Sequence, residues 1–225
     1  MYSFVKKFFI CFSLCIPFNV FGYDNCLRFK YDVDIDINNP TKDIVNIASS
    51  DEVLSGKLGY TISKIAYEYR LILVPVRVDN GYCVSLRGID IDVFFPEFNI
   101  VIDKRLKPDT CSYNIVLNHE QDHVKVHKKV LNDNIDGIRR ALIDAVKNSV
   151  KPVFVETLDN QEDIQQNMIK SIEKYKSVVQ VQDKISKLLE EENKKIDTRG
   201  DDYQVWKCKE FYEEMVKYGE NIRID

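Results

Sequence analysis

The chain contains three histidines, and two of them flank a glutamate in the segment His119-Glu120-Gln121-Asp122-His123. On an α-helix, side chains four positions apart lie on the same face, so both imidazoles can point at one metal ion. The carboxylate of Glu120 then lies beside that ion, where it can take a proton from water that attacks a carbonyl. The spacing predicts hydrolysis assisted by Zn²⁺, with Glu120 as general base.

The helix that carries this motif is expected to span residues 112–150, because Pro152 ends the helical pattern. Taking His119 as zero, His123 lies about 40° and Glu120 about 100° round the helix, and the apolar stripe centres near 120°. All of these side chains therefore face the core, as a site on the floor of a cleft requires. The stripe consists of Leu117, Val124, Leu131, Ile135, Ile138, Leu142 and Ala145.

A catalytic zinc site needs a third protein ligand and keeps one position open. His127 is a poor candidate, because on a straight helix it lies about 12 Å from His119 along the axis. A second helical pattern covers residues 158–196, and an antiparallel return would bring residues from about 186 onward to the level of the motif. The acidic residues of that region are the better candidates: Glu192, Asp197, Asp201 and Asp202.

The segment before the motif predicts strands. Residues 27–37 alternate apolar and polar side chains, which is typical of a half-buried strand. Residues 62–78 and 83–95 flank Asn80-Gly81, a pair that suits a hairpin turn, and residues 99–105 follow as another strand. Residues 40–59 are expected to form a loop with a short helix, and residues 203–218 a final helix. The expected fold is α+β, with a small antiparallel sheet followed by a long antiparallel helical hairpin that carries the motif.

Residues 1–22 resemble a secretory signal, with Lys6 and Lys7 before an apolar stretch too short for a comfortable membrane span. Its removal would leave a single domain, residues 23–225, with mainly strands in 23–110 and mainly helices in 111–225. We therefore expect a secreted or periplasmic protein that is soluble without its signal, with an uncleaved anchor as the alternative. The formal charge of -4 argues against nucleic acid or an anionic membrane as the main partner.

The chain has six cysteines, of which Cys11 and Cys15 fall inside the expected signal. The others suggest disulfides in an exported chain. We expect the pairs Cys111 with Cys208 and Cys26 with Cys83, although the sequence also permits other pairings and free buried thiols.

With these features the chain resembles the exported bacterial zincin-type proteases, in particular an uncharacterised family of predicted secreted zinc-dependent proteases. The resemblance covers roughly residues 27–203 and is specific only in the motif helix. In that family a long helical return ends in a cluster of Asp, Thr and His-Gly. Here Asp197 matches the aspartate of the cluster, and Asp202 falls nearest to the missing histidine. The resemblance thus implies a zincin-like metallopeptidase domain with Asp202 as the third ligand, in which a carboxylate replaces an imidazole.

The sequence therefore favours an exported zinc peptidase that acts on a peptide or protein substrate, with His119, His123 and Asp202 as ligands and Glu120 as the catalytic residue. The alternative is a non-catalytic exported interaction protein that presents a helical hairpin, with a structural metal or none. Neither the identity of the substrate nor the oligomeric state can be inferred from the sequence.

Overall fold

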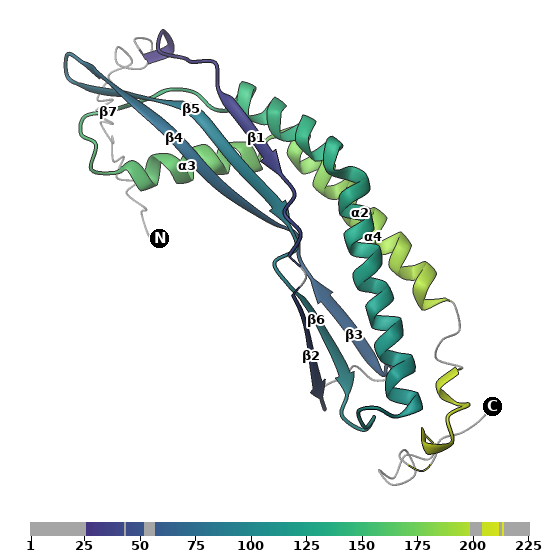
Figure 1. The fold of residues 1–225 in the computed structure, drawn as a ribbon. Helices are drawn as coiled ribbons and strands as arrows, with labels where there is room; N and C mark the ends of the chain where they lie inside the picture. Colours follow the sequence, from purple (N-terminus) through teal and green to yellow (C-terminus); the bar gives the residue numbers. More distant parts are fainter. Residues whose placement is uncertain (1–25, 43, 52–56, 199–203, 212, 214–225) are drawn as a thin grey trace, which may run out of the picture.

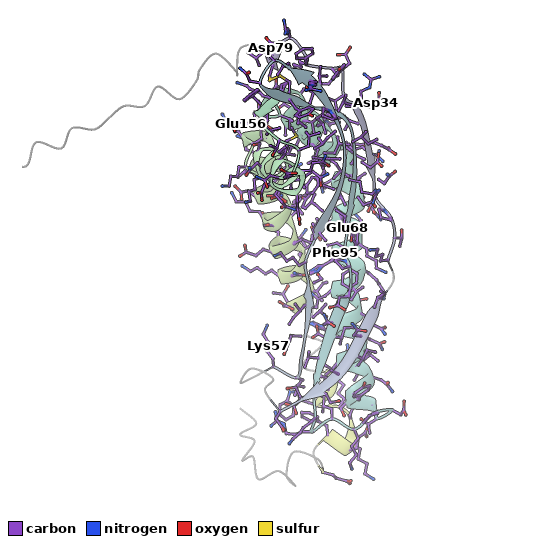
Figure 2. The ribbon with its side chains drawn as sticks, turned by 90° about the vertical axis from the view of Figure 1, so that its left-hand side faces the viewer. Asp34, Lys57, Glu68, Asp79, Phe95 and Glu156 are labelled. Carbon is purple, nitrogen blue, oxygen red and sulfur yellow. A yellow bond between two sulfur atoms is a disulfide. The ribbon has the colours of Figure 1, made fainter. Side chains whose placement is uncertain are left out.

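One long helix runs beside two short sheets and gives the molecule its elongated shape (Figure 1). This helix, α2, spans Cys111–Ser149 and carries the motif near its N-terminus. The computed structural model describes residues 26–42, 44–51, 57–198, 204–211 and 213. In the edge-on view, Asp79 lies near one end of the molecule and Lys57 toward the other (Figure 2).

The two sheets follow one another along α2. In sheet A, β5 (Gly81–Phe94) pairs antiparallel with β4 (Ala66–Val78) and with β7 (Val153–Val155), and parallel with β1 (Asp34–Asn38). In sheet B, β6 (Phe98–Asp103) lies between β2 (Val45–Ser50), to which it is parallel, and β3 (Gly59–Ser63), to which it is antiparallel. Both sheets therefore mix parallel and antiparallel pairs.

The expectation of a single small antiparallel sheet with a long helical hairpin is thus wrong, although the fold is α+β. β2 lies in the stretch expected to be a loop. It is an edge strand whose residues are exposed or half-buried, so its sequence lacks the alternation that marks a half-buried strand. The second helical pattern also breaks at Lys174 and Tyr175, which leaves α3 (Gln161–Glu173) and α4 (Lys176–Asp197). β7 and α3 therefore lie between α2 and α4 in the chain.

The chain passes between the two sheets through short breaks between consecutive strands, from β3 to β4 and from β5 to β6. The hairpin expected at Asn80 is confirmed, because β4 and β5 pair along their whole length up to Val78 and Gly81. β5 stops at Phe94 and the chain resumes as β6 after Pro96, which has no backbone N–H to donate to a ladder. The expected strand at residues 27–37 is paired only from Asp34 onward.

The core lies between the sheets and the helices. Fully buried side chains come from β5, β6 and α2, among them Ile89, Ile91, Ile100, Ile102, Ile138 and Leu142. α4 packs along α2 in the opposite direction. The hydroxyl of Ser177, near the start of α4, donates to the carbonyl of Ala141 (3.0 Å), and Asn193, near its end, reaches His123. This antiparallel return determines which residues of α4 meet the motif.

Both expected disulfides are confirmed. Cys26 pairs with Cys83 of β5, and Cys111, the first residue of α2, pairs with Cys208. Cys111, Cys208 and Glu210 also lie close enough to suggest a metal site, but the disulfide removes both thiolates as ligands. None of the helices in the described part of the chain is both long and apolar enough to cross a bilayer. The expected signal at residues 1–22 lies outside the described residues.

Candidate metal centre

Two side chains hold the first turn of α2 in place, one from the residue just before the helix and one from the C-terminal segment. The hydroxyl of Thr110 accepts a hydrogen bond from the backbone N–H of Tyr113 (3.3 Å), as an N-cap residue does. The carboxylate of Glu210 accepts from the N–H of Cys111 (2.6 Å), next to the disulfide to Cys208. Hydrogen bonds from its own backbone N–H and from those of Cys111 and Ser112 keep the pKa of Glu210 below its ordinary value. The helix therefore begins at a fixed point two turns before His119.

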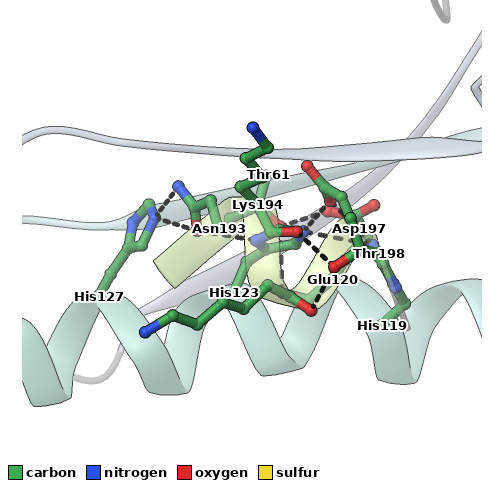
Figure 3. A network of polar contacts seen from close by, with 10 residues as sticks. Thr61, His119, Glu120, His123, His127, Asn193, Lys194, Asp197 and Thr198 are labelled. Atoms are coloured by element: carbon green, nitrogen blue, oxygen red, sulfur yellow. Dashed lines mark hydrogen bonds and ion pairs between the residues drawn. The ribbon is translucent and has the colours of Figure 1, made fainter. Parts of the chain in front are cut away.

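The imidazoles of His119 and His123 converge on the carboxylate of Asp197 at the end of α4 (Figure 3). The two Nε2 atoms lie 3.3 Å apart, and Oδ1 of Asp197 lies 3.4 Å from Nε2 of His119 and 3.1 Å from Nε2 of His123. A zinc ion at about 2.0–2.1 Å from each atom of a tetrahedral set would separate its ligands by roughly 3.3 Å. These donor atoms therefore fit one face of a tetrahedral zinc site.

Of the acidic residues expected to supply the third ligand, Asp197 is the one that lies beside the two histidines in the described part of the chain. Asp202, the expected third ligand, lies outside the described residues, as does Asp201. Glu192 instead forms an ion pair with Lys195 on the solvent side of α4. His127 does not join the cluster, because its ring contacts Ser63 and Asn193. The resemblance matched Asp197 only to the aspartate of the family cluster, whereas the geometry makes it a potential ligand.

Glu120 lies beside this cluster and is buried, with 4% of its surface exposed. The hydroxyl of Thr61 on β3 donates to its Oε2 (2.8 Å). Burial raises the pKa of Glu120 above its ordinary value, and the nearby Asp197 adds to the shift, whereas the Thr61 hydrogen bond and the two motif histidines oppose it. A carboxyl with a raised pKa is suited to accept a proton and then release it.

Sequence reasoning missed the contribution of β3. Gly59, Thr61 and Ser63 alternate along this strand, so they share the face that meets α2. A Cβ atom on Gly59 would lie 2.8 Å from Cγ1 of Val116 and 3.1 Å from Oε1 of Glu120, which only a glycine avoids. A small or polar residue at every second position of the sequence is the pattern from which a strand packed against a polar helix face could have been predicted.

Sequence reasoning also missed Asn193, which lies one helical turn before Asp197 on the same face of α4. Its Oδ1 lies 2.8 Å from Nδ1 of His123, and its Nδ2 lies 3.0 Å from Nε2 of His127. On the far side of that ring, Nδ1 of His127 lies 2.5 Å from the hydroxyl of Ser63. Burial lowers the pKa of His127, which favours a neutral ring.

A cavity of about 360 Å³ opens over the cluster. The polar residues that line it include His119, Glu120, His123 and Asp197. The larger apolar residues in the lining are Leu58, Ile115, Val116 and Val205. The side chain of Asp197 is about half exposed, at 52%, so the cluster is accessible from the cavity. The site thus offers a space large enough for part of a ligand, with a proton acceptor and convergent metal donors at one end.

Comparisons with family models, with curated proteins and with solved structures find no match to this chain.

Proposed function

We propose that this protein is a zinc-dependent peptidase in which His119, His123 and Asp197 hold the ion and Glu120 is the general base. The observation that carries the proposal is the set of separations between the donor atoms, 3.1 to 3.4 Å, next to a buried glutamate in a cavity. Two imidazoles and one carboxylate are a common ligand set for catalytic zinc, and they leave one position open. Zinc bound there would supply a Lewis acid that lowers the pKa of water and polarises a carbonyl.

The residues of the chain perform the proton transfers. Glu120 accepts a proton from the attacking water and returns it to the nitrogen that leaves as the peptide bond breaks. Thr61 holds one oxygen of that carboxylate, and Glu120 is one of the residues that line the cavity. Burial favours the protonated form of Glu120 between the two steps, because it raises the pKa.

The free edge of β3 favours a peptide over other substrates. Within the described residues β3 pairs only with β6, and Asp103 N–H donates to Leu58 C=O (2.9 Å) in that ladder. In an antiparallel register of Gly59 with Ile102, this bond directs the backbone groups of Gly59 and Thr61 away from β6. Both residues line the cavity, so an extended peptide could pair with this edge beside Glu120.

Disulfides are typical of chains that fold outside the cytoplasm, so the two disulfides support action in an oxidising compartment. We therefore propose that the peptidase acts outside the cytoplasm, as the signal expected at residues 1–22 would require.

Cleavage of a mixed peptide library tests the function even though the substrate is unidentified. The purified protein is loaded with zinc, and new termini are identified by mass spectrometry. We expect cleavage that a chelator abolishes and added zinc restores. Glu120→Gln should not cleave, whereas the control Glu190→Gln, at an exposed position of α4, should cleave like the wild type. Equal cleavage by Glu120→Gln and the wild type would contradict the proposal.

A further inference from the structure

A line of hydrogen-bonding groups runs from the motif to β3, and its members come from three elements. Asn193 of α4 lies between the rings of His123 and His127 of α2 (Figure 3). The hydroxyl of Ser63 on β3, beside Nδ1 of His127, ends the line. His127 is 7% exposed, and its ring lies 6.0 Å from the ring of Phe95 and 6.4 Å from that of Phe98, between centroids. The ring of His127 is therefore held at a fixed distance from Asn193.

We assign the direction of each hydrogen bond from the zinc-binding role of His123 and from a partner for each half of the Asn193 amide, whose Oδ1 and Nδ2 lie 3.1 and 3.0 Å from Nε2 of His127. The zinc-binding atom of His123 is Nε2, so the proton of its neutral ring must lie on Nδ1, which donates to Oδ1 of Asn193 (2.8 Å). Nδ2 of Asn193 then donates to Nε2 of His127 (3.0 Å), and Nδ1 of His127 donates to Ser63. In the opposite tautomer of His127, Oδ1 of Asn193 would accept from both rings and Nδ2 would lose this acceptor.

We propose that Asn193 and His127 are positioning residues that keep His123 in the tautomer able to bind zinc. Asn193 accepts the Nδ1 proton of His123, and His127 fixes the amide so that its oxygen, not its nitrogen, faces His123. The inference rests on the proposed function, because it assigns a role to residues behind a zinc ligand.

The physical need for such a lock comes from the imidazole itself. A neutral histidine side chain in water prefers the proton on Nε2, which is the wrong nitrogen for this site. If the amide of Asn193 turned over, its Nδ2 would face Nδ1 of His123 and force the proton onto Nε2. A neutral His127 opposes that rotation, because its Nε2 accepts from the amide nitrogen. Groups behind a metal ligand that set its tautomer typically change metal affinity by about 10–100-fold.

The test compares paired variants of the full chain. Asn193→Leu removes the acceptor, whereas Asn193→Asp keeps an oxygen for the Nδ1 proton of His123. His127→Leu removes the lock on the amide, whereas His127→Gln keeps an oxygen acceptor near it. Gln180→Leu is a control on an exposed position of the same helix. Zinc dissociation constants come from chelator competition, and imidazole ¹⁵N–¹H correlation spectra of the folded metal-free proteins report the tautomer of His123.

We expect Nδ1 of His123 to carry a proton in the wild type and in Gln180→Leu, whether or not Nε2, which faces Asp197 in the metal-free protein, is protonated as well. Asn193→Leu should remove the proton from Nδ1 in favour of the Nε2–H form and weaken zinc binding by about 10–100-fold. His127→Leu should change both in the same direction, and Asn193→Asp and His127→Gln should stay near the wild type. If the wild type binds zinc but Asn193→Leu binds it as tightly with the tautomer unchanged, this inference alone fails. A wild type that binds no zinc would overturn the proposed function as well.

Discussion

The two halves of α2 bury different chemistry, although they belong to one unbroken helix. Between residues 130 and 146 every buried side chain of α2 is apolar, and these side chains belong to one apolar cluster with residues of β5, α3 and α4. Between residues 112 and 127 the buried set includes Ser112, Glu120, His123 and His127, next to sheet B and the end of α4. The first region is organised for stability, and the second places polar groups where they cost stability.

The polar half shows what makes such burial tolerable. A buried polar group without a partner costs about 1–3 kcal/mol, and more when it is charged. Here Thr61 pairs with Glu120, Asn193 with His123 and Ser63 with His127, and each partner comes from an element other than α2. The site thus depends on β3 and α4 being in place, whereas the apolar half depends on shape and volume. Substitutions in the two halves should therefore have separable effects.

The largest effect should come from the polar half. We expect Glu120→Gln to lower kcat/KM for peptide cleavage by about 10²- to 10⁴-fold, because it removes the proton acceptor. Zinc content should stay at the wild-type level, since the ligands His119, His123 and Asp197 are intact. Kinetics on a cleaved library peptide, with metal analysis of the same sample, checks both. If zinc were lost together with activity, Glu120 would have to be reassigned as a ligand.

The apolar half should respond in stability alone. Leu142 is fully buried, so Leu142→Ala should lower the free energy of unfolding by about 2–5 kcal/mol through lost burial and a cavity. The zinc dissociation constant of the folded variant should not change, because Leu142 lies about five helical turns from His123 along α2. Denaturant unfolding and chelator competition measure these quantities separately. A large loss of zinc affinity would show that the two halves are coupled.

The disulfides extend the comparison to the two ends of the molecule. Replacing both members of either pair by serine should cost roughly 2–4 kcal/mol of stability. Only Cys111→Ser/Cys208→Ser should also reduce peptide cleavage, because this pair fixes the start of α2 to the segment that brings Val205 into the cavity. Cys26→Ser/Cys83→Ser is the matched control. Equal losses of activity in the two folded variants would argue against a local role.

The smallest effect is a dependence of stability on pH. Burial raises the pKa of Glu120 in the folded protein above its unfolded value of about 4.3. The free energy of unfolding is therefore highest, as far as Glu120 contributes, below the unfolded pKa, and it falls as the pH rises through the folded-state pKa. Metal-free Glu120→Gln should therefore melt at a higher temperature than the metal-free wild type at neutral pH. The difference should shrink toward zero as the pH falls below about 4. Thermal melts at a series of pH values test this, and a variant that melts lower at neutral pH would refute it.

Local patterns were sufficient for part of this account. The extent of α2, the hairpin at Asn80 and the inward direction of Glu120 follow from periodicity and turn chemistry, and the structure agrees. β2 could not be found in this way, because an exposed edge strand carries no burial pattern. Its parallel pairing with β6 depends on chain contacts that no local window contains.

The third candidate ligand shows a different limit. The antiparallel return placed the relevant residues of α4 from about 186 onward, and Asn193 and Asp197 do lie at that level. Choosing among several carboxylates requires the register of α4 on α2. The break at Lys174 and Tyr175 and the contact of Ser177 with Ala141 help to fix this register. No periodicity in the sequence specifies these tertiary contacts, so the choice of Asp202 rested on resemblance alone.

The most direct test of the central claim is the zinc content of the wild type, Asp197→Ala and the control Asp183→Ala on an exposed position of α4. Each protein is stripped of metal, incubated with zinc, freed of excess ion and measured by mass spectrometry. The account predicts about one zinc ion per chain in the wild type and in Asp183→Ala, and a marked loss in Asp197→Ala. A wild type without zinc, or full occupancy in Asp197→Ala, would contradict the proposed centre of His119, His123 and Asp197.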